Sequence, residues 1–198
     1  MSYTKRLIEA CEKIIRGDWI NALIQISITL DAVAKKTYGG RPGKRIKRYI
    51  RENQYILTRI AMLHLEVHGD LMFQVAGGKT MKFEEIIYEL IRCALLHEGE
   101  LDSRVKIVQS PSIGLDDQGT FLLSVHMIMA LCLLLVADPQ NIQIRWPETA
   151  SFTVEGRTIR FSDVQGDPKK LVDLFRIISE ERSNKSLKRD AAKGSRAP

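Results

Sequence analysis

The sequence predicts a mainly α-helical protein, in which a helical bundle is followed by a small C-terminal β-hairpin and one more helix. Apolar residues recur at helical spacing through most of residues 1–138, and the short alternating runs typical of strands come mainly after Pro139. The 198-residue chain is long enough for one well-buried core. Its 44% hydrophobic and 27% charged residues are ordinary globular values, which argues against disorder of the whole chain.

The first half of the chain predicts four helices. The first covers residues 3–16 and stops at Gly17, and the second runs from 19 to about 38 before a segment rich in glycine and proline. A short basic helix at 44–53 and a further helix at 55–67 follow.

The next part of the chain predicts a helix from about 82 to 98, a strand at 105–109 and a polar connector at 110–119. The run 121–137 is apolar along its whole length. It is slightly short for a membrane span and has acidic rather than basic flanks, so we expect a fully buried core helix and no membrane association.

After Pro139 the pattern predicts an edge strand at 142–146, a hairpin of 152–154 with 158–161, and a helix that starts at Asp167-Pro168. Residues 183–198 are basic and poor in apolar residues, which predicts a disordered tail. The expected organisation is a bundle over 1–138, a hairpin-plus-helix appendage over 139–182, and the tail over 183–198.

The cysteines and the N-terminus indicate the compartment. Cys11, Cys93 and Cys132 are few, odd in number and widely spaced, which predicts neither a disulfide framework nor a zinc motif. The N-terminus lacks the hydrophobic region of a signal peptide. We therefore expect a reduced, intracellular protein of the cytoplasm.

The net charge of +6 is unevenly placed. Residues 35–51 hold eight basic residues and no acidic one, and 182–198 hold six basic residues and one acidic one. The rest of the chain is therefore acidic overall, and this asymmetry favours a polyanionic partner.

Four of these basic residues share one face of the predicted helix 44–53, opposite its apolar side: Lys44, Lys47, Arg48 and Arg51. Such a face could follow the phosphates of RNA, with an affinity that depends on salt. The alternative is an ordinary solvated helix face.

The most informative local pattern is Arg92 followed five residues later by His97, near the end of the predicted helix 82–98. An arginine can hold a phosphate and a histidine can move a proton, so the pair could cleave a phosphodiester without a metal. Five α-helical steps leave the two side chains about 140° apart. A site therefore needs a loosened last turn or a second copy of the chain across a two-fold axis. The alternative is a surface arginine and a histidine that caps the helix.

The segment Tyr88–Glu100, which follows an earlier helix containing Ile28–Lys36, resembles the HEPN superfamily of helical-bundle proteins with an Arg-x4-6-His motif. The similarity covers roughly residues 3–137 and implies a bundle of HEPN type. Many members are metal-independent endoribonucleases of toxin–antitoxin, phage-defence and RNA-processing systems, and they act as dimers with a composite site. The resemblance thus implies RNA as substrate, a homodimer, a cognate antitoxin or other partner protein, and no cofactor.

Carried over by position, Arg92 would stabilise the phosphate charge in the transition state, and His97 would transfer a proton to or from the 2′-hydroxyl and the leaving group. Cys93 departs from the family pattern, because active members usually have a polar residue after the arginine, often Asn, Asp or His. A thiol cannot make the same hydrogen bonds. This departure leaves open a member that binds RNA or proteins without cutting.

Two further patterns concern charge and metal. Asp31 lies inside an apolar helix, where a carboxylate generally needs a basic partner. Arg92 could be that partner, which would make Asp31 an orienting residue, although a purely structural ion pair explains it equally well. His64 and His68 have a spacing that can bind zinc, but no third ligand matches, so we expect no metal site.

The resemblance, together with the Arg92 and His97 pair, therefore implies a metal-independent endoribonuclease acting through 2′-hydroxyl attack. The alternative is a non-catalytic RNA- or protein-binding module, such as the antidote or scaffold of a two-component system. A DNA-binding regulator is disfavoured because no helix-turn-helix with a basic second helix is visible.

Overall fold

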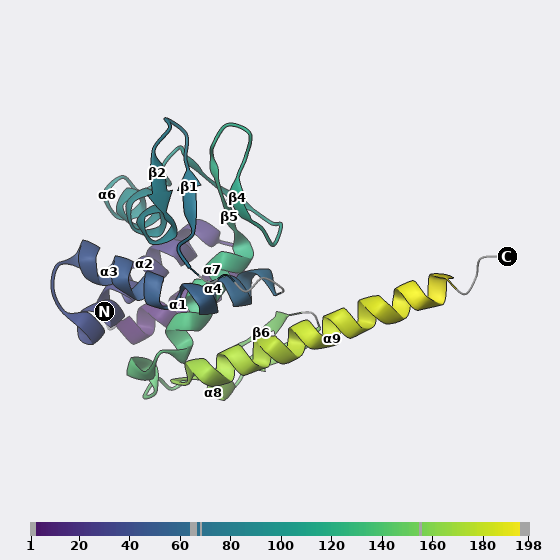
Figure 1. Ribbon diagram of the computed structural model, residues 1–198. Coiled ribbons are helices and arrows are strands. Elements are labelled where there is room, and N and C mark those ends of the chain that lie inside the picture. The colour runs from purple at the N-terminus through teal and green to yellow at the C-terminus, as the bar shows by residue number, and fades with distance from the viewer. Residues whose placement is uncertain (1–2, 64–66, 68, 155, 195–198) are drawn as a thin grey trace.

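The computed structural model describes residues 3–63, 67, 69–154 and 156–194, and for 185–194 it describes the main chain alone. The described chain is mainly helical, as predicted, with small sheets beside the helices (Figure 1). Four helices open the chain: α1 (Tyr3–Ile15), α2 (Trp19–Tyr38), α3 (Pro42–Glu52) and α4 (Gln54–Met62). The last is shorter than the predicted helix 55–67, because Leu63 leaves the helix at a φ of 54°.

The helix α7 (Val125–Ala137) occupies the centre of the molecule, and almost all of its side chains are buried. It contacts α1, α2 and α4, and also the later helices α8 (Phe161–Val164) and α9 (Pro168–Gly194). Burial of each large aliphatic side chain stabilises the fold by about 1.5–3 kcal/mol. The prediction of a buried core helix is confirmed for these residues. No helix in the described ranges combines the length and the apolar character needed to cross a membrane.

The first four residues of the predicted helix 121–137 form a strand instead, and that part of the prediction is wrong. Strand β5 (Phe121–Ser124) pairs in parallel with β3 (Val105–Val108) and antiparallel with β4 (Ile113–Leu115). The strand gives way to α7 at Ser124, whose hydroxyl accepts a hydrogen bond from the backbone N–H of His126. A short apolar run does not distinguish a buried strand from a buried helix.

A second sheet near the first was not predicted. It is the antiparallel hairpin of β1 (Met72–Gln74) and β2 (Thr80–Lys82), which encloses the glycine loop at 76–78. The backbone N–H of Ala76 donates to the carbonyl of Gly119 at 2.8 Å, which ties this hairpin to the turn before β5.

The C-terminal part confirms the hairpin and corrects the edge strand. Strands β6 (Ser151–Val154) and β7 (Arg157–Arg160) pair antiparallel. Residues 142–146 are not a strand but follow the short helix η2 (Pro139–Asn141). The side-chain amide of Gln165 donates to the carbonyls of Asn141 and Ile144, at 2.8 and 2.6 Å. This side chain takes up carbonyl groups that a strand partner would otherwise bind.

Helix α9 extends further than the sequence predicts. Its first part packs against α4 and α7, and its later part runs away from the body (Figure 1). Residues 183–198 were expected to form a disordered tail, whereas the described main chain is helical to Gly194; residues 195–198 lie outside the described residues. The segment contains Ala, Leu, Lys and Arg, which are strong helix formers, and no proline or glycine before Gly194.

A buried hydrogen bond joins α3 to the end of α7. The Tyr49 hydroxyl donates to Asp138 Oδ2 at 2.7 Å, and both residues are buried. Burial, and then the nearby Asp138 carboxylate, raise the pKa of Tyr49 well above its ordinary value. The bond thus holds a neutral phenol against a carboxylate that has little access to water.

Substitution Tyr49→Phe is expected to lower the free energy of unfolding by about 1–3 kcal/mol, because it leaves a buried carboxylate oxygen without its donor. Urea denaturation followed by circular dichroism measures this. The matched control is Tyr38→Phe, which removes a 2.6 Å bond to the exposed Glu52, where water can replace the hydroxyl. Equal losses in the two variants would contradict the role assigned to Tyr49.

Candidate functional site

The helix that carries Arg92 and His97 has three consecutive parts. It begins as α5 (Phe83–Glu85), widens into the π-helix η1 (Ile86–Cys93) and ends as α6 (Ala94–His97). In a π-helix the backbone hydrogen bonds span five residues instead of four, and such segments are frequent at functional sites. The widening brings residues five apart closer to one face, and Cys93 is accordingly one of the groups that raise the pKa of Tyr88. We expected a site in one chain to need a loosened last turn, but the π-helix ends at Cys93 and the last turn, which carries His97, is α-helical.

Asp31 on α2 takes its closest ion pair from α3. Arg45 donates from Nε and Nη2 to Asp31 Oδ1, at 2.9 and 2.7 Å. Its remaining Nη1 donates to the carbonyl of Gly40 at 2.6 Å. Arg45 is 9% exposed and the Asp31 side chain 26% exposed, so this pair joins the start of α3 to α2 with limited access to water.

Arg92 is the second arginine at Asp31, but it is held more loosely. Its Nη2 lies 3.9 Å from Asp31 Oδ2, so the expected pair is present as a long contact. Its side chain is 14% exposed. Its Nη1 contacts the sulfur of Cys93 at 3.9 Å, and its buried Nε has no hydrogen-bond partner in the described part of the chain.

The ring of Tyr88 connects Arg92 to the basic helix α3. The guanidinium of Arg92 and the ammonium of Lys47 each lie 5.6 Å from the ring centroid. A Cβ on Gly43 would lie 3.2 Å from the ring, so α3 and η1 approach closely there. Burial raises the pKa of Tyr88, and Cys93 adds to the shift.

The four predicted RNA-binding residues lie on α3 as expected, opposite the buried Ile46, Tyr49 and Ile50. Two of them are already paired. Lys47 lies 3.5 Å from Glu89, and Arg48 donates to Glu52 at 2.6 Å.

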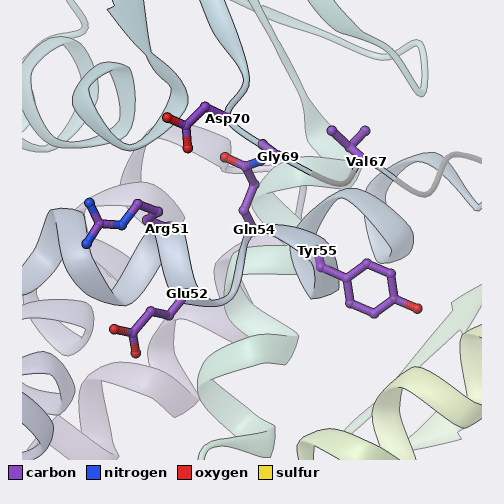
Figure 2. Close-up of a pocket in the computed structure, with 7 residues that line it drawn as sticks. All are labelled: Arg51, Glu52, Gln54, Tyr55, Val67, Gly69 and Asp70. Carbon is purple, nitrogen blue, oxygen red and sulfur yellow. Dashed lines mark hydrogen bonds between the residues drawn. The ribbon is translucent and has the colours of Figure 1, made fainter.

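Lys44 and Arg51 are exposed, and neither forms an ion pair with another residue of the described ranges. Arg51 borders an open pocket of about 250 Å³ at the junction of α3 and α4. Figure 2 shows its guanidinium on the opposite side of the pocket from Tyr55. Half of the predicted face is therefore available for a ligand.

His97 is exposed at the end of α6, whereas Arg92 is mostly covered. Within the part of the chain that the structure describes, the two side chains share no hydrogen bond. The contacts described above form one cluster, and none of them involves His97; its members are Asp31, Arg45, Lys47, Tyr88, Glu89 and Arg92.

No group of three or more potential metal ligands occurs among the described residues. His64 and His68, which have zinc-like spacing, lie outside the described residues.

Three members of the cluster were not singled out from the sequence: Arg45, Tyr88 and Glu89. Arg45 precedes Ile46 and lies four residues before Tyr49, so it lies toward the buried side of α3. That position could have identified it as the partner of Asp31. Glu89 contacts both Lys47 and Lys79, and no local pattern in the sequence indicates this.

The residues of this cluster lie in a part of the chain that matches a known protein family. The model of the Rv1289 family matches residues 2–190, which include the whole cluster. No curated protein and no solved structure matches the chain significantly. The family name states no activity.

Substitution Arg45→Met is expected to destabilise the fold by about 2–4 kcal/mol, because it leaves the Asp31 carboxylate without its closest partner. The matched control is Arg48→Met on the same helix, whose ion pair with Glu52 is exposed and should contribute much less. Urea unfolding of both variants at low salt measures the difference, because a charged denaturant would screen the ion pairs. A similar midpoint for the two would show that the Asp31–Arg45 pair does not anchor α3.

Proposed function

The chain belongs to the Rv1289 family, and we propose that it is a metal-independent endoribonuclease of HEPN type. The observation that most supports this proposal is how the guanidinium of Arg92 is held. Asp31, Tyr88 and Cys93 hold its guanidinium in place, yet its only carboxylate contact among the described residues is a long one of 3.9 Å. Arg45, and not Arg92, forms the short hydrogen bonds with Asp31. The N–H groups of Arg92 can therefore donate hydrogen bonds to a phosphate.

The basic face of α3 supplies the approach for RNA. Lys47 and Arg92 each lie 5.6 Å from the centroid of the same Tyr88 ring, so this ring links the basic face to the arginine. Lys44 and Arg51 add exposed charge along α3. Such a surface attracts the phosphate backbone without reading base sequence.

The proposed reaction uses the 2′-hydroxyl of RNA as nucleophile. The 2′-oxygen attacks the adjacent phosphorus, the bond from phosphorus to the 5′-oxygen breaks, and a cyclic phosphate and a 5′-hydroxyl result. Arg92 stabilises the charge that builds on the non-bridging oxygens. His97 takes the proton from the 2′-hydroxyl or gives one to the leaving oxygen. The reaction needs neither metal nor cofactor.

A homodimer completes the proposed site. In one chain Arg92 is mostly covered and His97 is exposed at the end of α6, so in this proposal a second copy supplies the histidine for one of the two proton transfers. A two-fold axis beside α6 would bring His97 of the partner subunit to the same phosphate. Nucleases of this kind require control, and an antitoxin or other partner protein in a defence or toxin–antitoxin system would supply it.

One observation favours a second candidate, a non-catalytic module that binds RNA or a partner protein. Arg92 contacts the thiol of Cys93, the residue that departs from the HEPN pattern, and its side chain is mostly covered. In this case Arg92 and Asp31 are structural, and the surface of α3 alone binds the ligand.

The first test is cleavage of end-labelled RNA in excess chelator. His97→Ala is expected to slow cleavage by about 100- to 10,000-fold, through loss of proton transfer. Arg92→Gln is expected to slow it by about 100- to 1,000-fold, through loss of charge stabilisation. Glu98→Gln, an exposed neighbour of His97, serves as the matched control and should cleave normally. Absence of cleavage by the wild type, with RNA still bound, would favour the second candidate.

The salt dependence of RNA binding tests the surface separately. For single-stranded RNA each phosphate contact adds about 0.7 to the magnitude of the slope of log affinity against log salt. The double substitution Lys44→Ala, Arg51→Ala should therefore reduce that magnitude by about 1.4. Arg160→Ala, an exposed cation on β7, should leave the slope unchanged. Fluorescence anisotropy over a salt series measures both, and an unchanged slope in the double variant would exclude α3 as the RNA surface.

A further inference from the structure

Two cysteines meet in the core where α1 packs against α7. The sulfurs of Cys11 and Cys132 are 3.3 Å apart, although the residues are 121 positions apart in the chain. Both cysteines are free thiols, with exposures of 4% and 0%. A disulfide needs the sulfurs only about 1.2 Å closer, because its S–S distance is about 2.05 Å.

A cavity gives small molecules a path to one of these thiols. It has a volume of about 120 Å³ and is lined on one side by residues of α1, which include Cys11 and Ile15, and on the other by Trp146, Ala150 and Phe161. Ile15 is 65% exposed, so this side of the cavity reaches the surface. Cys132 does not line the cavity, and its sulfur contacts the sulfur of Cys11. The arrangement separates a thiol that small molecules can reach, Cys11, from a second thiol that does not border the cavity, Cys132.

We propose that Cys11 and Cys132 form an oxidisable pair that closes to an intramolecular disulfide when a small hydroperoxide enters this cavity. The sulfur of Cys11 attacks the peroxide, the O–O bond breaks, and Cys11 becomes a sulfenic acid while the peroxide leaves as water or an alcohol. The sulfur of Cys132 then attacks the sulfenic sulfur. The S–S bond forms and the S–O bond breaks, with loss of water. Two thiols and one hydroperoxide are consumed in total.

The surroundings make this reaction slow and selective. Burial, and then the adjacent Cys132, raise the pKa of the Cys11 thiol well above its ordinary value. Since the thiolate is the nucleophile, the first step is slow compared with that of an exposed cysteine. The second step is intramolecular and fast, because the resolving sulfur is already in contact.

The disulfide would fasten the N-terminal helix to the central one. A cross-link across 121 residues strongly restricts the unfolded chain. We therefore expect the oxidised protein to melt at least about 5 °C higher than the reduced protein.

The test uses the full chain with Cys93→Ser, which removes the half-exposed third thiol and any disulfide between copies. After incubation with hydrogen peroxide and alkylation, peptide mass spectrometry should find Cys11 linked to Cys132, with the loss of two hydrogen masses and of both free thiols. Dithiothreitol should restore the thiols and the original melting temperature. The readout is chemical and does not involve RNA, so it is independent of the proposed nuclease activity.

Two results would overturn the proposal. One is the persistence of both free thiols after peroxide has fully oxidised exposed methionines of the same sample. The other is a Cys11 sulfinic or sulfonic acid without a cross-link, which would show that Cys132 does not resolve the sulfenic acid.

Discussion

The helix Val125–Ala137 has no polar face, and the arrangement of the other helices follows from the need to cover it. A helix that is apolar all round is stable in water only when other elements surround it. Here α1, α2, α4, α8 and α9 do so, from both ends of the chain. The residues that flank α7 form polar contacts. Ser124 caps its first turn, and Asp138 accepts a hydrogen bond from the hydroxyl of Tyr49. The hydrogen bond between Tyr49 and Asp138 fixes the position of α3, and therefore also that of the basic surface on α3.

The sequence predicted the helices well wherever an apolar stripe and a glycine or proline boundary occurred together, as at Gly17 and Pro42. It failed where long-range pairing decides the structure. Phe121–Ser124 is apolar enough for either state and becomes a strand only because β3 and β4 are beside it. Residues 142–146 alternate like a strand but find the side chain of Gln165 instead of a strand partner.

For the candidate site, the sequence indicated the residue types but not their pairing. Asp31 needed a basic partner, and two arginines meet it, with Arg45 closer than the expected Arg92. The choice between them depends on how α3 lies across α2, which no local pattern records. The π-helix is likewise a result of packing, and it changes the angular relation that an ideal α-helix implies for Tyr88, Arg92 and Cys93. The roles of Arg92 and His97 remain predictions.

The central place of α7 also affects how the chain is made. A ribosome delivers the N-terminal helices first, and although α1 and α2 pack against each other, the sides that they turn to α7 stay uncovered until residue 137 has emerged. Full burial of α1 and α2 therefore waits until more than half of the chain has been made. During that interval the nascent protein exposes the same residues that later form its core, and it is then a natural client for chaperones that shield apolar segments.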